Sequence, residues 1–190
     1  MELSNAIHNR RAVRAYTQQP VPAEVLKNLI DDAIMAPSAS HSQPWAFGII
    51  QGREKLQAIS TQAKDYALAH IQEHPRLQPY VSSLQKAQFN IFYDAPVLVV
   101  IFANSQAPSP QGDAALAAQN LMLSAFAAGL GTCWIGLSMP YLNGAEFKKT
   151  YNVPQEMLAI APIIVGHPQT FPAKPERKPA LILFSDTTEA

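Results

Sequence analysis

A nearly uncharged segment, residues 113–128, most limits how this chain can fold. It carries a single charge, Asp113 at its start, and then consists mainly of alanine, leucine, methionine and phenylalanine. Such residues favour a helix, and Gly129 after the last of them favours a helix stop. A helix that is apolar on every side has no face to present to water. It must therefore be buried, either in the core or at an interface between subunits.

The composition fits a protein that hides much of its surface. The chain has 190 residues, of which 48% are hydrophobic and 15% are charged. This length predicts a single domain spanning residues 1–190, and the low charge favours a large core or a subunit interface. The 16 prolines also displace charged residues, so composition alone does not decide between the two.

Charge and cysteine content exclude several classes of partner. Lys and Arg together number 14, as do Asp and Glu, so the net charge of zero gives no reason to expect nucleic acid or a membrane as a partner. The single cysteine, Cys133, excludes an intrachain disulfide framework and a cysteine-rich metal site, and we expect no metal. Residues 1–14 lack a signal-peptide pattern, and no long apolar run is present. We therefore expect a cytoplasmic protein.

Periodicity predicts that helices alternate with strands, which indicates a layered α/β or α+β domain. The predicted strands are residues 45–50, 96–102, 132–136 and 158–165. The predicted helices are a short one around residues 3–7, one that begins at residue 22 and ends before Pro37, and four at residues 52–74, 82–93, 113–128 and 147–151. The strand at 96–102 is continuously apolar, which predicts burial on both faces. Residues 168–190 form a proline-rich, extended tail, whose apolar run at 181–184 can pair with a sheet edge, such as that of a second subunit.

Three arginines lie within five residues near the N-terminus: Arg10, Arg11 and Arg14. They repel one another unless an anion or carboxylates neutralise them. A solvated basic turn is one interpretation, and a phosphate clamp is the other, because guanidinium groups match phosphate oxygens bidentately. A smaller basic cluster, Lys174, Arg177 and Lys178, lies near the other end of the chain.

Two further segments have the composition of ligand-binding loops. Residues 36–45 read Ala-Pro-Ser-Ala-Ser-His-Ser-Gln-Pro-Trp, which suits contacts to a heterocycle but also an ordinary connection. Residues 129–136 read Gly-Leu-Gly-Thr-Cys-Trp-Ile-Gly. The first two glycines are no dinucleotide-binding fingerprint, because they follow a helix rather than a strand and the third glycine is missing, so a helix stop is the better interpretation. Gly136 can let the backbone approach a planar ligand closely, whereas Cys133 in an apolar strand is expected to be inert packing.

In this order the segments resemble the nitroreductase family of FMN-dependent oxidoreductases. The family pattern has an Arg-Arg-Ser-x-Arg-x-Phe-like run, Ala-Pro-Ser-x-x-Asn-x-Gln-Pro-Trp, a Gln-Asn-x-x-Leu helix leading to Gly-Leu-Gly-x-Cys-Trp-Ile-Gly, and Val-Gly-x-Pro before a basic tail. The matching segments here are 10–16, 36–45, 119–136 and 165–168, followed by Arg177 and Lys178. The resemblance thus spans nearly the whole chain.

The resemblance implies an α+β, three-layer fold with a central mixed or antiparallel sheet, and an intertwined homodimer with one FMN in each of two pockets at its interface. The FMN-contacting residues that it implies are Arg10, Arg11, Ala12, Arg14, Pro37, Ser38, Ala39, His41, Gln43, Trp134, Ile135, Gly136, Arg177 and Lys178. Of these, Arg10 and Arg177 would hold the phosphate, and Arg14 would lie near the flavin pyrimidine. The loop that contains Pro37 would come from the other subunit, and a backbone N–H around Gly136 would lie close to flavin N5.

Two positions depart from the family pattern. Ala12 replaces a frequent serine and so removes one hydroxyl donor to the phosphate, and His41 replaces a frequent asparagine and introduces a titratable group. The polar contact to the pyrimidine from the region after Gly52 cannot be placed by the pattern; Gln62 and Lys64 are candidates.

No side chain in the chain can accept a hydride and return it, so redox activity requires the cofactor and no catalytic side chain is expected. The implied activity is ping-pong transfer of hydride from NADH or NADPH, through flavin N5, to a small electron-poor acceptor: a nitroaromatic, quinone, enone or flavin. Arg14 and Gly136 are the candidates for tuning the flavin.

The sequence does not distinguish this activity from related activities in the family, such as dehalogenation, ene reduction and flavin fragmentation. A non-catalytic FMN-binding or storage dimer is the alternative from another class, and a structural dimer that has lost FMN is disfavoured by the arginines.

Overall fold

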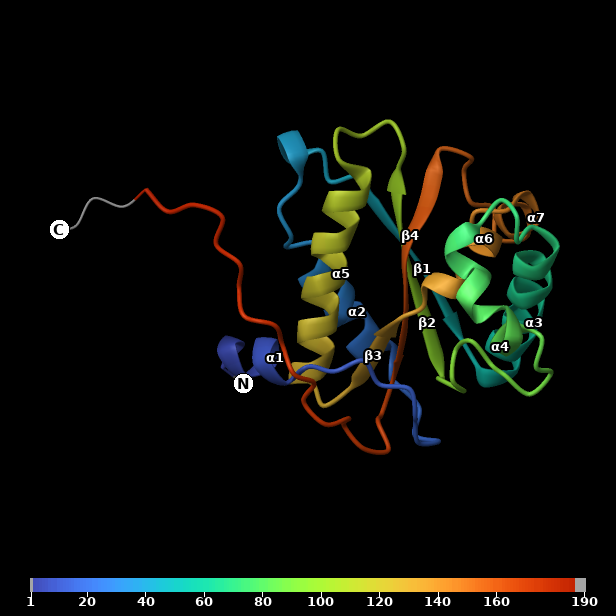
Figure 1. Cartoon of the computed structure of the whole chain (residues 1–190), viewed down its shortest axis with the longest axis horizontal. Coiled ribbons are helices and arrows are strands. Elements are labelled where there is room, and N and C mark those ends of the chain that lie inside the picture. Colours follow the sequence, from blue (N-terminus) through green and yellow to red (C-terminus); the bar gives the residue numbers. More distant parts are fainter. Residues whose placement is uncertain (1, 187–190) are drawn as a thin grey trace.

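The structure, a computed structural model that describes residues 2–186, is built on one antiparallel sheet (Figure 1). The strands lie in the order β1-β2-β4-β3; they are β1 (Trp45–Gln51), β2 (Val97–Asn104), β3 (Gly131–Trp134) and β4 (Met157–Gly166). All pairings are antiparallel, and the β2–β4 register shifts between Ile101 and Phe102. The central strand β2 is buried except at its last residue, as its unbroken apolar run predicts.

Helices cover both faces of the sheet, so the chain forms three layers (Figure 1). The α-helices are α1 (Leu3–Asn9), α2 (Ala23–Ala33), α3 (Arg53–Ala69), α4 (Val81–Leu84), α5 (Pro110–Ala127), α6 (Met139–Leu142) and α7 (Ala145–Thr150). Three short 3-10 helices are η1 (Ala39–His41), η2 (Pro75–Tyr80) and η3 (Gly136–Ser138). Helices α2 and α5 pack on one face with odd-numbered residues of β2, and α3, α4, α6 and α7 pack on the other with even-numbered ones. The α+β prediction with an antiparallel central sheet is confirmed.

Helix α5 is the uncharged segment that the sequence requires to be buried. It begins at Pro110, three residues earlier than predicted, and it ends as predicted at a glycine in the left-handed region, Gly129 with φ +76°. There the Gly129 N–H donates to the Phe126 carbonyl and the Leu130 N–H to the Ala125 carbonyl, which satisfies the last turn. Only one side of α5 is covered within the protomer, since Leu116 keeps 46% of its surface exposed.

The prediction of a helix at residues 82–93 is wrong. Helix α4 ends at Leu84, and turns follow because side chains bind the backbone groups that a helix would use. The Asn90 amide oxygen accepts from the Phe92 N–H at 2.9 Å, and the Ser60 hydroxyl oxygen accepts from the Ile91 N–H at 3.0 Å. Tyr93 and Asp94 then adopt φ of 52° and 55°. The helix predicted at 52–74 is also shorter: α3 ends at Ala69, and the separate 3-10 helix η2 begins at Pro75 and contains Pro79.

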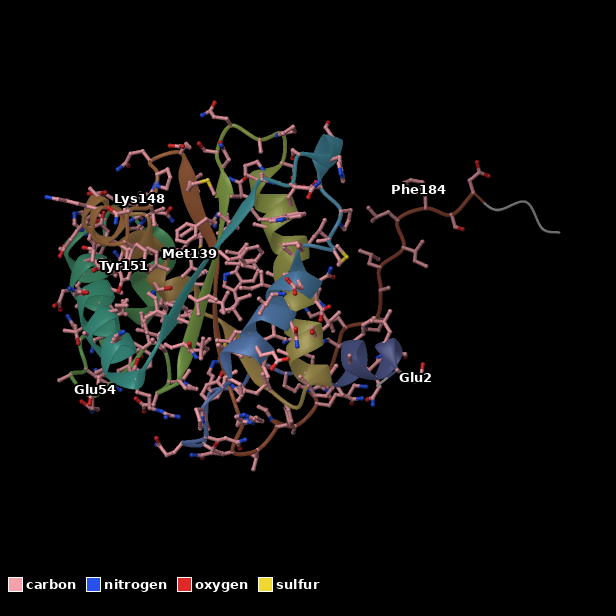
Figure 2. All side chains as sticks on the ribbon, turned by 180° about the vertical axis from the view of Figure 1, so that it is seen from behind. Glu2, Glu54, Met139, Lys148, Tyr151 and Phe184 are labelled. Carbon is pink, nitrogen blue, oxygen red and sulfur yellow. The ribbon has the colours of Figure 1, made fainter. Side chains whose placement is uncertain are left out.

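The C-terminal tail leaves the body as an extended chain (Figure 1). Figure 2 shows Phe184 on this tail, away from the folded layers. The side chains of 181–184 are between 74% and 87% exposed. Their packing on a partner subunit stays a prediction, and residues 187–190 of the tail lie outside the described residues.

Candidate functional site

The basic run lies directly against strand β3. The Val13 N–H donates to the Thr132 carbonyl at 2.9 Å, and Ala12 pairs with Thr132 as a parallel bridge. Gly131 permits this approach, because a Cβ on it would lie 2.7 Å from the Val13 side chain. Two motifs that are far apart in the sequence are thereby held side by side, with Arg10 and Arg11 at one end of the bridge and Arg14 at the other.

Arginines from both ends of the chain meet at one cavity of about 220 Å³. It is lined by Ile7, His8, Arg10, Arg11, Lys174, Pro175 and Arg177. Burial lowers the pKa of Arg10 from its ordinary value, and the neighbouring Arg11 and Arg177 lower it further. The predicted meeting of Arg10 with Arg177 is therefore present in the structure, whereas Ala12 and Lys178 do not line this cavity.

Arg11 is largely buried, and backbone carbonyls bind its guanidinium group. Its Nη1 donates to the carbonyls of His8 at 2.9 Å and Arg10 at 2.7 Å, which caps the end of α1. Its Nε is buried and has no hydrogen-bond partner among the described residues, and the same holds for the Thr132 hydroxyl. An unpaired buried donor is costly, so each of these two groups costs free energy in the folded state.

The cations of this cavity have no carboxylate partner in the part of the chain that the structure describes. The ion pair found among the described residues joins Lys27 to Asp31; it is exposed on α2, outside the cavity. Neighbouring acids among the described residues therefore do not balance the charge of this segment. Like charges held together without counter-charge bind an anion favourably.

A second cavity, of about 380 Å³, begins where the basic run ends. It is lined by Arg14, Arg76, Leu77, Tyr80, Ile91, Tyr93, Cys133, Trp134, Ile135, Gly136, Leu137 and Met139. The Arg14 guanidinium lies over the Tyr93 ring, 5.7 Å from its centre. A Cβ on Gly136 would meet nothing within 4 Å, so the backbone there borders open space. Trp134 keeps 36% of its surface exposed.

Cys133 lies in this cavity wall and behaves as packing. Its side chain is buried within the core cluster. Burial raises the pKa of the Cys133 thiol, and the opposing effects of Arg14 and Arg10 do not cancel that rise. A thiol held protonated is a poor nucleophile, which agrees with the prediction of inert packing.

The loop 36–45 is rigidly held at the opposite end of α5. Ser40, His41 and Gln43 have φ of 52°, 55° and 43°, conformations that non-glycine residues rarely adopt. The Ser38 hydroxyl oxygen accepts from the Gln43 N–H at 3.0 Å, and Gln43 Nε2 lies 2.9 Å from His41 Nε2. Ser42 and Gln43 line a separate open cavity of about 550 Å³. The predicted loop residues Pro37, Ser38, Ala39 and His41 line neither of the two cavities near the basic run.

Comparison with known proteins places these features in a family. The sequence model of the nitroreductase family matches residues 7–167. The chain belongs to the nitroreductase family.

Two curated members of the nitroreductase family align along most of this chain. A candidate NADH dehydrogenase/NAD(P)H nitroreductase of Methanothermobacter thermautotrophicus is 28% identical over 177 residues, which cover 90% of this chain and 80% of that protein. The FMN reductase (NADPH) of Bacillus subtilis is 26% identical over 200 residues, covering 96% of this chain and 72% of that protein. A nitroreductase from Bacteroides fragilis with bound FMN has the same fold, with a TM-score of 0.82 over 99% of this chain and 100% of that one at 21% identity.

Within this nitroreductase-family chain, sequence patterns did not mark every residue that lines the second cavity. Arg76, Tyr80 and Tyr93 come from the segment between α3 and β2, where no motif marks individual residues. Gln62 and Lys64 do not line that cavity. The Gln62 side-chain oxygen accepts from the Tyr141 hydroxyl at 2.9 Å, and Lys64 Nζ donates to the Lys86 and Ala87 carbonyls at 2.9 and 3.3 Å.

Two further residues of the site were not marked by the sequence patterns. His8 lines the first cavity, two residues before Arg10. Asp113 is buried and anchors the loop 36–45. An acidic residue in the first turn of an otherwise uncharged helix was the available signal, because helix starts favour carboxylates.

Among the described residues, no helix has the length and apolar character needed to cross a membrane.

Proposed function

We propose that this chain is an FMN-dependent oxidoreductase that works as a homodimer. It takes hydride from NADH or NADPH and passes it to a small electron-poor acceptor by a ping-pong mechanism. The observation that carries the proposal is the meeting of Arg10 and Arg177 at one cavity, which the segment 10–14 connects to the second, larger cavity. FMN has the same organisation, a dianionic phosphate at one end and a planar ring at the other.

The first cavity suits the phosphate. Arg10, Arg177 and Lys174 supply positive charge that no described carboxylate neutralises. Arg11 lines the same cavity and adds a further positive charge. Ala12 provides no hydroxyl, so the phosphate would depend on guanidinium groups and backbone N–H groups. Lys178 lies one residue beyond Arg177 and would add charge without direct contact.

The second cavity suits the ring. Its walls are mainly apolar, and the open space before Gly136 leaves room for a flat ligand to approach the backbone of Ile135 and Gly136. Arg14 would lie at the pyrimidine edge, where a cation stabilises a negatively charged ring. Trp134, half exposed in the same wall, would pack beside the ring.

Bound FMN would supply the redox chemistry: two electrons and a proton arrive as hydride from NAD(P)H, and with one solvent proton they convert, for example, a nitro group to a nitroso group and water. The chain's own residues would bind, orient and tune. No side chain is assigned a proton-transfer role. One open face serving donor and acceptor in turn accounts for ping-pong kinetics.

The place of the loop 36–45 supports the homodimer, given that this loop contacts the ring. Helix α5 has 18 residues and is therefore about 27 Å long. Ala39 is tied to Asp113 at its start, whereas Ala12 is paired with Thr132 beyond its end. Within one protomer the two segments thus lie near opposite ends of α5, whereas a two-fold pair with antiparallel α5 helices would bring one of each to the same ring. The exposed Leu116 on α5 and Met35 after α2 would be covered by that pairing.

The test begins with the absorbance of the purified protein and its mass in solution. We expect a yellow dimer with about one FMN per chain, bleached by NADH or NADPH without oxygen and restored by an electron-poor acceptor. A yellow dimer that neither nicotinamide bleaches would instead support the FMN-storage alternative. A colourless protein that binds no added FMN would overturn the proposal.

A further inference from the structure

Arg76 is a cation that the proposed function leaves unused. It lines the second cavity, whose lining also includes Trp134 and Gly136. The residues lining this cavity include two arginines, Arg14 and Arg76, and no aspartate or glutamate. With Arg14 assigned to the flavin, Arg76 is the remaining charge available to whatever enters the cavity above the ring.

The position of Arg76 is fixed by its backbone, while its side chain is free. It lies in η2 between Pro75 and Pro79, whose rings restrict the local backbone. Its side chain is exposed and makes no hydrogen bond or ion pair with the described residues. The next residue, Leu77, is buried in the core and anchors this segment. A guanidinium group on such an anchored segment can contact a ligand without first breaking an internal contact.

The surroundings of Arg76 indicate the shape of that ligand. Leu77, Ile91, Leu137 and Met139 give an apolar lining, to which Tyr80 and Tyr93 add aromatic rings. Tyr80 is 49% exposed. Apolar and aromatic walls favour a flat, conjugated molecule, and an unpaired guanidinium at the rim favours a carboxylate or another planar anion on it.

We propose that Arg76 is a specificity-determining residue that selects aromatic acceptors carrying an anionic substituent. This inference rests on the proposed function, because it assumes that the acceptor enters the cavity over the flavin. Arg76 binds the anionic group and holds the electron-poor ring over the cofactor. Neutral acceptors of the same size lack this contact.

A matched pair of acceptors tests the inference. 4-Nitrobenzoate and 4-nitrobenzamide have nearly the same shape and differ in charge. The holoprotein is reduced photochemically, so the measurement does not depend on NAD(P)H, and the second-order rate of flavin reoxidation is measured for each acceptor. Wild type is expected to prefer the benzoate by about tenfold, the effect of one charged hydrogen bond. Benzoate and benzamide binding to the oxidised protein, followed by calorimetry, gives a second readout that needs no turnover.

Variants assign the preference to Arg76. Arg76→Gln is expected to bring the benzoate-to-benzamide ratio close to one, Arg76→Glu to reverse it, and Arg76→Lys to keep part of it. Lys55→Gln, which removes an exposed cation of α3 outside the cavity, controls for general attraction of anions. An unchanged ratio in Arg76→Gln, or a wild-type ratio near one, would overturn the inference. A raised KM for NADPH in Arg76→Gln with the acceptor ratio intact would also overturn it, since Arg76 would then bind the donor.

The two proposals fail in different ways. If NADH and NADPH leave the flavin oxidised while the photoreduced protein still prefers the benzoate through Arg76, the hydride-transfer proposal fails and the Arg76 inference stands. If the nicotinamides bleach the flavin and the acceptor ratio is near one, the reverse holds.

Discussion

The backbone N–H of Ala39 donates a hydrogen bond to the carboxylate of Asp113, 3.1 Å away and 74 residues along the chain. Asp113 is 3% exposed, and its other oxygen accepts a long hydrogen bond from the Ser42 hydroxyl at 3.5 Å. The first turn of α5 thus carries a buried charge that positions the loop expected to contact the partner's flavin. Helix starts stabilise such a charge, and the donors of the loop satisfy it.

Removing this anchor is expected to loosen the loop. Asp113→Ala should lower the free energy of unfolding by about 2 kcal/mol, because it leaves the Ala39 N–H without its charged acceptor. It should also weaken FMN binding. Urea unfolding and FMN titration check both effects, with Asp113→Asn as the control, since its amide oxygen still accepts from Ala39. If the alanine variant matches wild type in both measurements, the loop does not depend on Asp113.

Reversing charge at the first cavity is expected to prevent cofactor retention. Arg10→Glu should purify largely without flavin, because the variant places a carboxylate beside the phosphate. Arg177→Gln should weaken FMN binding by about ten- to a hundredfold. Lys27→Gln, which removes a cation on α2, is the matched control. Arg10→Glu protein that is yellow with a full complement of flavin would show that Arg10 does not hold the phosphate.

Arg14 is expected to act on the rate more than on binding. Arg14→Ala should slow flavin reduction by NAD(P)H more than it weakens FMN binding, because the guanidinium stabilises charge that develops on the ring. Stopped-flow reduction and equilibrium titration of the same preparation separate the two quantities, and Arg14→Lys should be intermediate. Equal losses in rate and affinity would contradict this role.

Two nearby glycines are expected to respond differently to substitution. A Cβ on Gly131 would lie 2.7 Å from Val13, so Gly131→Ala should cost about 1–3 kcal/mol of stability. A side chain on Gly136 enters open space at an ordinary backbone conformation. Gly136→Val should therefore fold normally but exclude the ring, giving a stable and colourless protein. Thermal unfolding with flavin absorbance distinguishes them; a yellow Gly136→Val protein would place the ring elsewhere.

The buried thiol gives a pH prediction. Because burial raises the pKa of Cys133, the unfolded chain ionises first, from about pH 8.5. The contribution of the buried, protonated thiol to the free energy of unfolding is fully present below that pH. It is lost as the pH rises through the higher pKa of the folded state. Wild type should lose stability above about pH 8.5 more steeply than Cys133→Ala, as urea unfolding across pH would show. Fast thiol labelling of the native protein at neutral pH would contradict this picture.

The sequence predicted most of the fold because its strongest signals are local. The unbroken apolar run of β2 and the uncharged α5 each dictate burial whatever surrounds them, and Gly129 stops α5 by its own backbone freedom. The segment 82–93 failed because its fate depends on distant residues. Ser60 and Lys64 of α3 bind its backbone, and no periodicity within the segment can show that.

The residues of the candidate site also divide into those that local sequence signals marked and those that only distant contacts reveal. The arginines 10, 11, 14 and 177 were marked by their local density of charge, and the structure gathers Arg10, Arg11 and Arg177 at one cavity. Arg76 and Asp113 were not marked, since each is a single charge whose meaning depends on what it faces. The loop 36–45 was expected to act from the partner subunit, and its place at the far end of α5 gives that expectation a geometric reason.

The central claim is that each FMN is held by the arginines of one protomer and the loop of the other. It is tested most directly with a heterodimer that pairs an Arg10→Glu protomer with an Ala39→Trp protomer, isolated through two different affinity tags. Each homodimer variant should bind no FMN. The heterodimer should regain one intact site, about one FMN per two chains, because one interface pocket then combines wild-type arginines with a wild-type loop. A heterodimer that binds no FMN would show that the arginines and the loop act within one protomer, and the account of a shared site would be wrong.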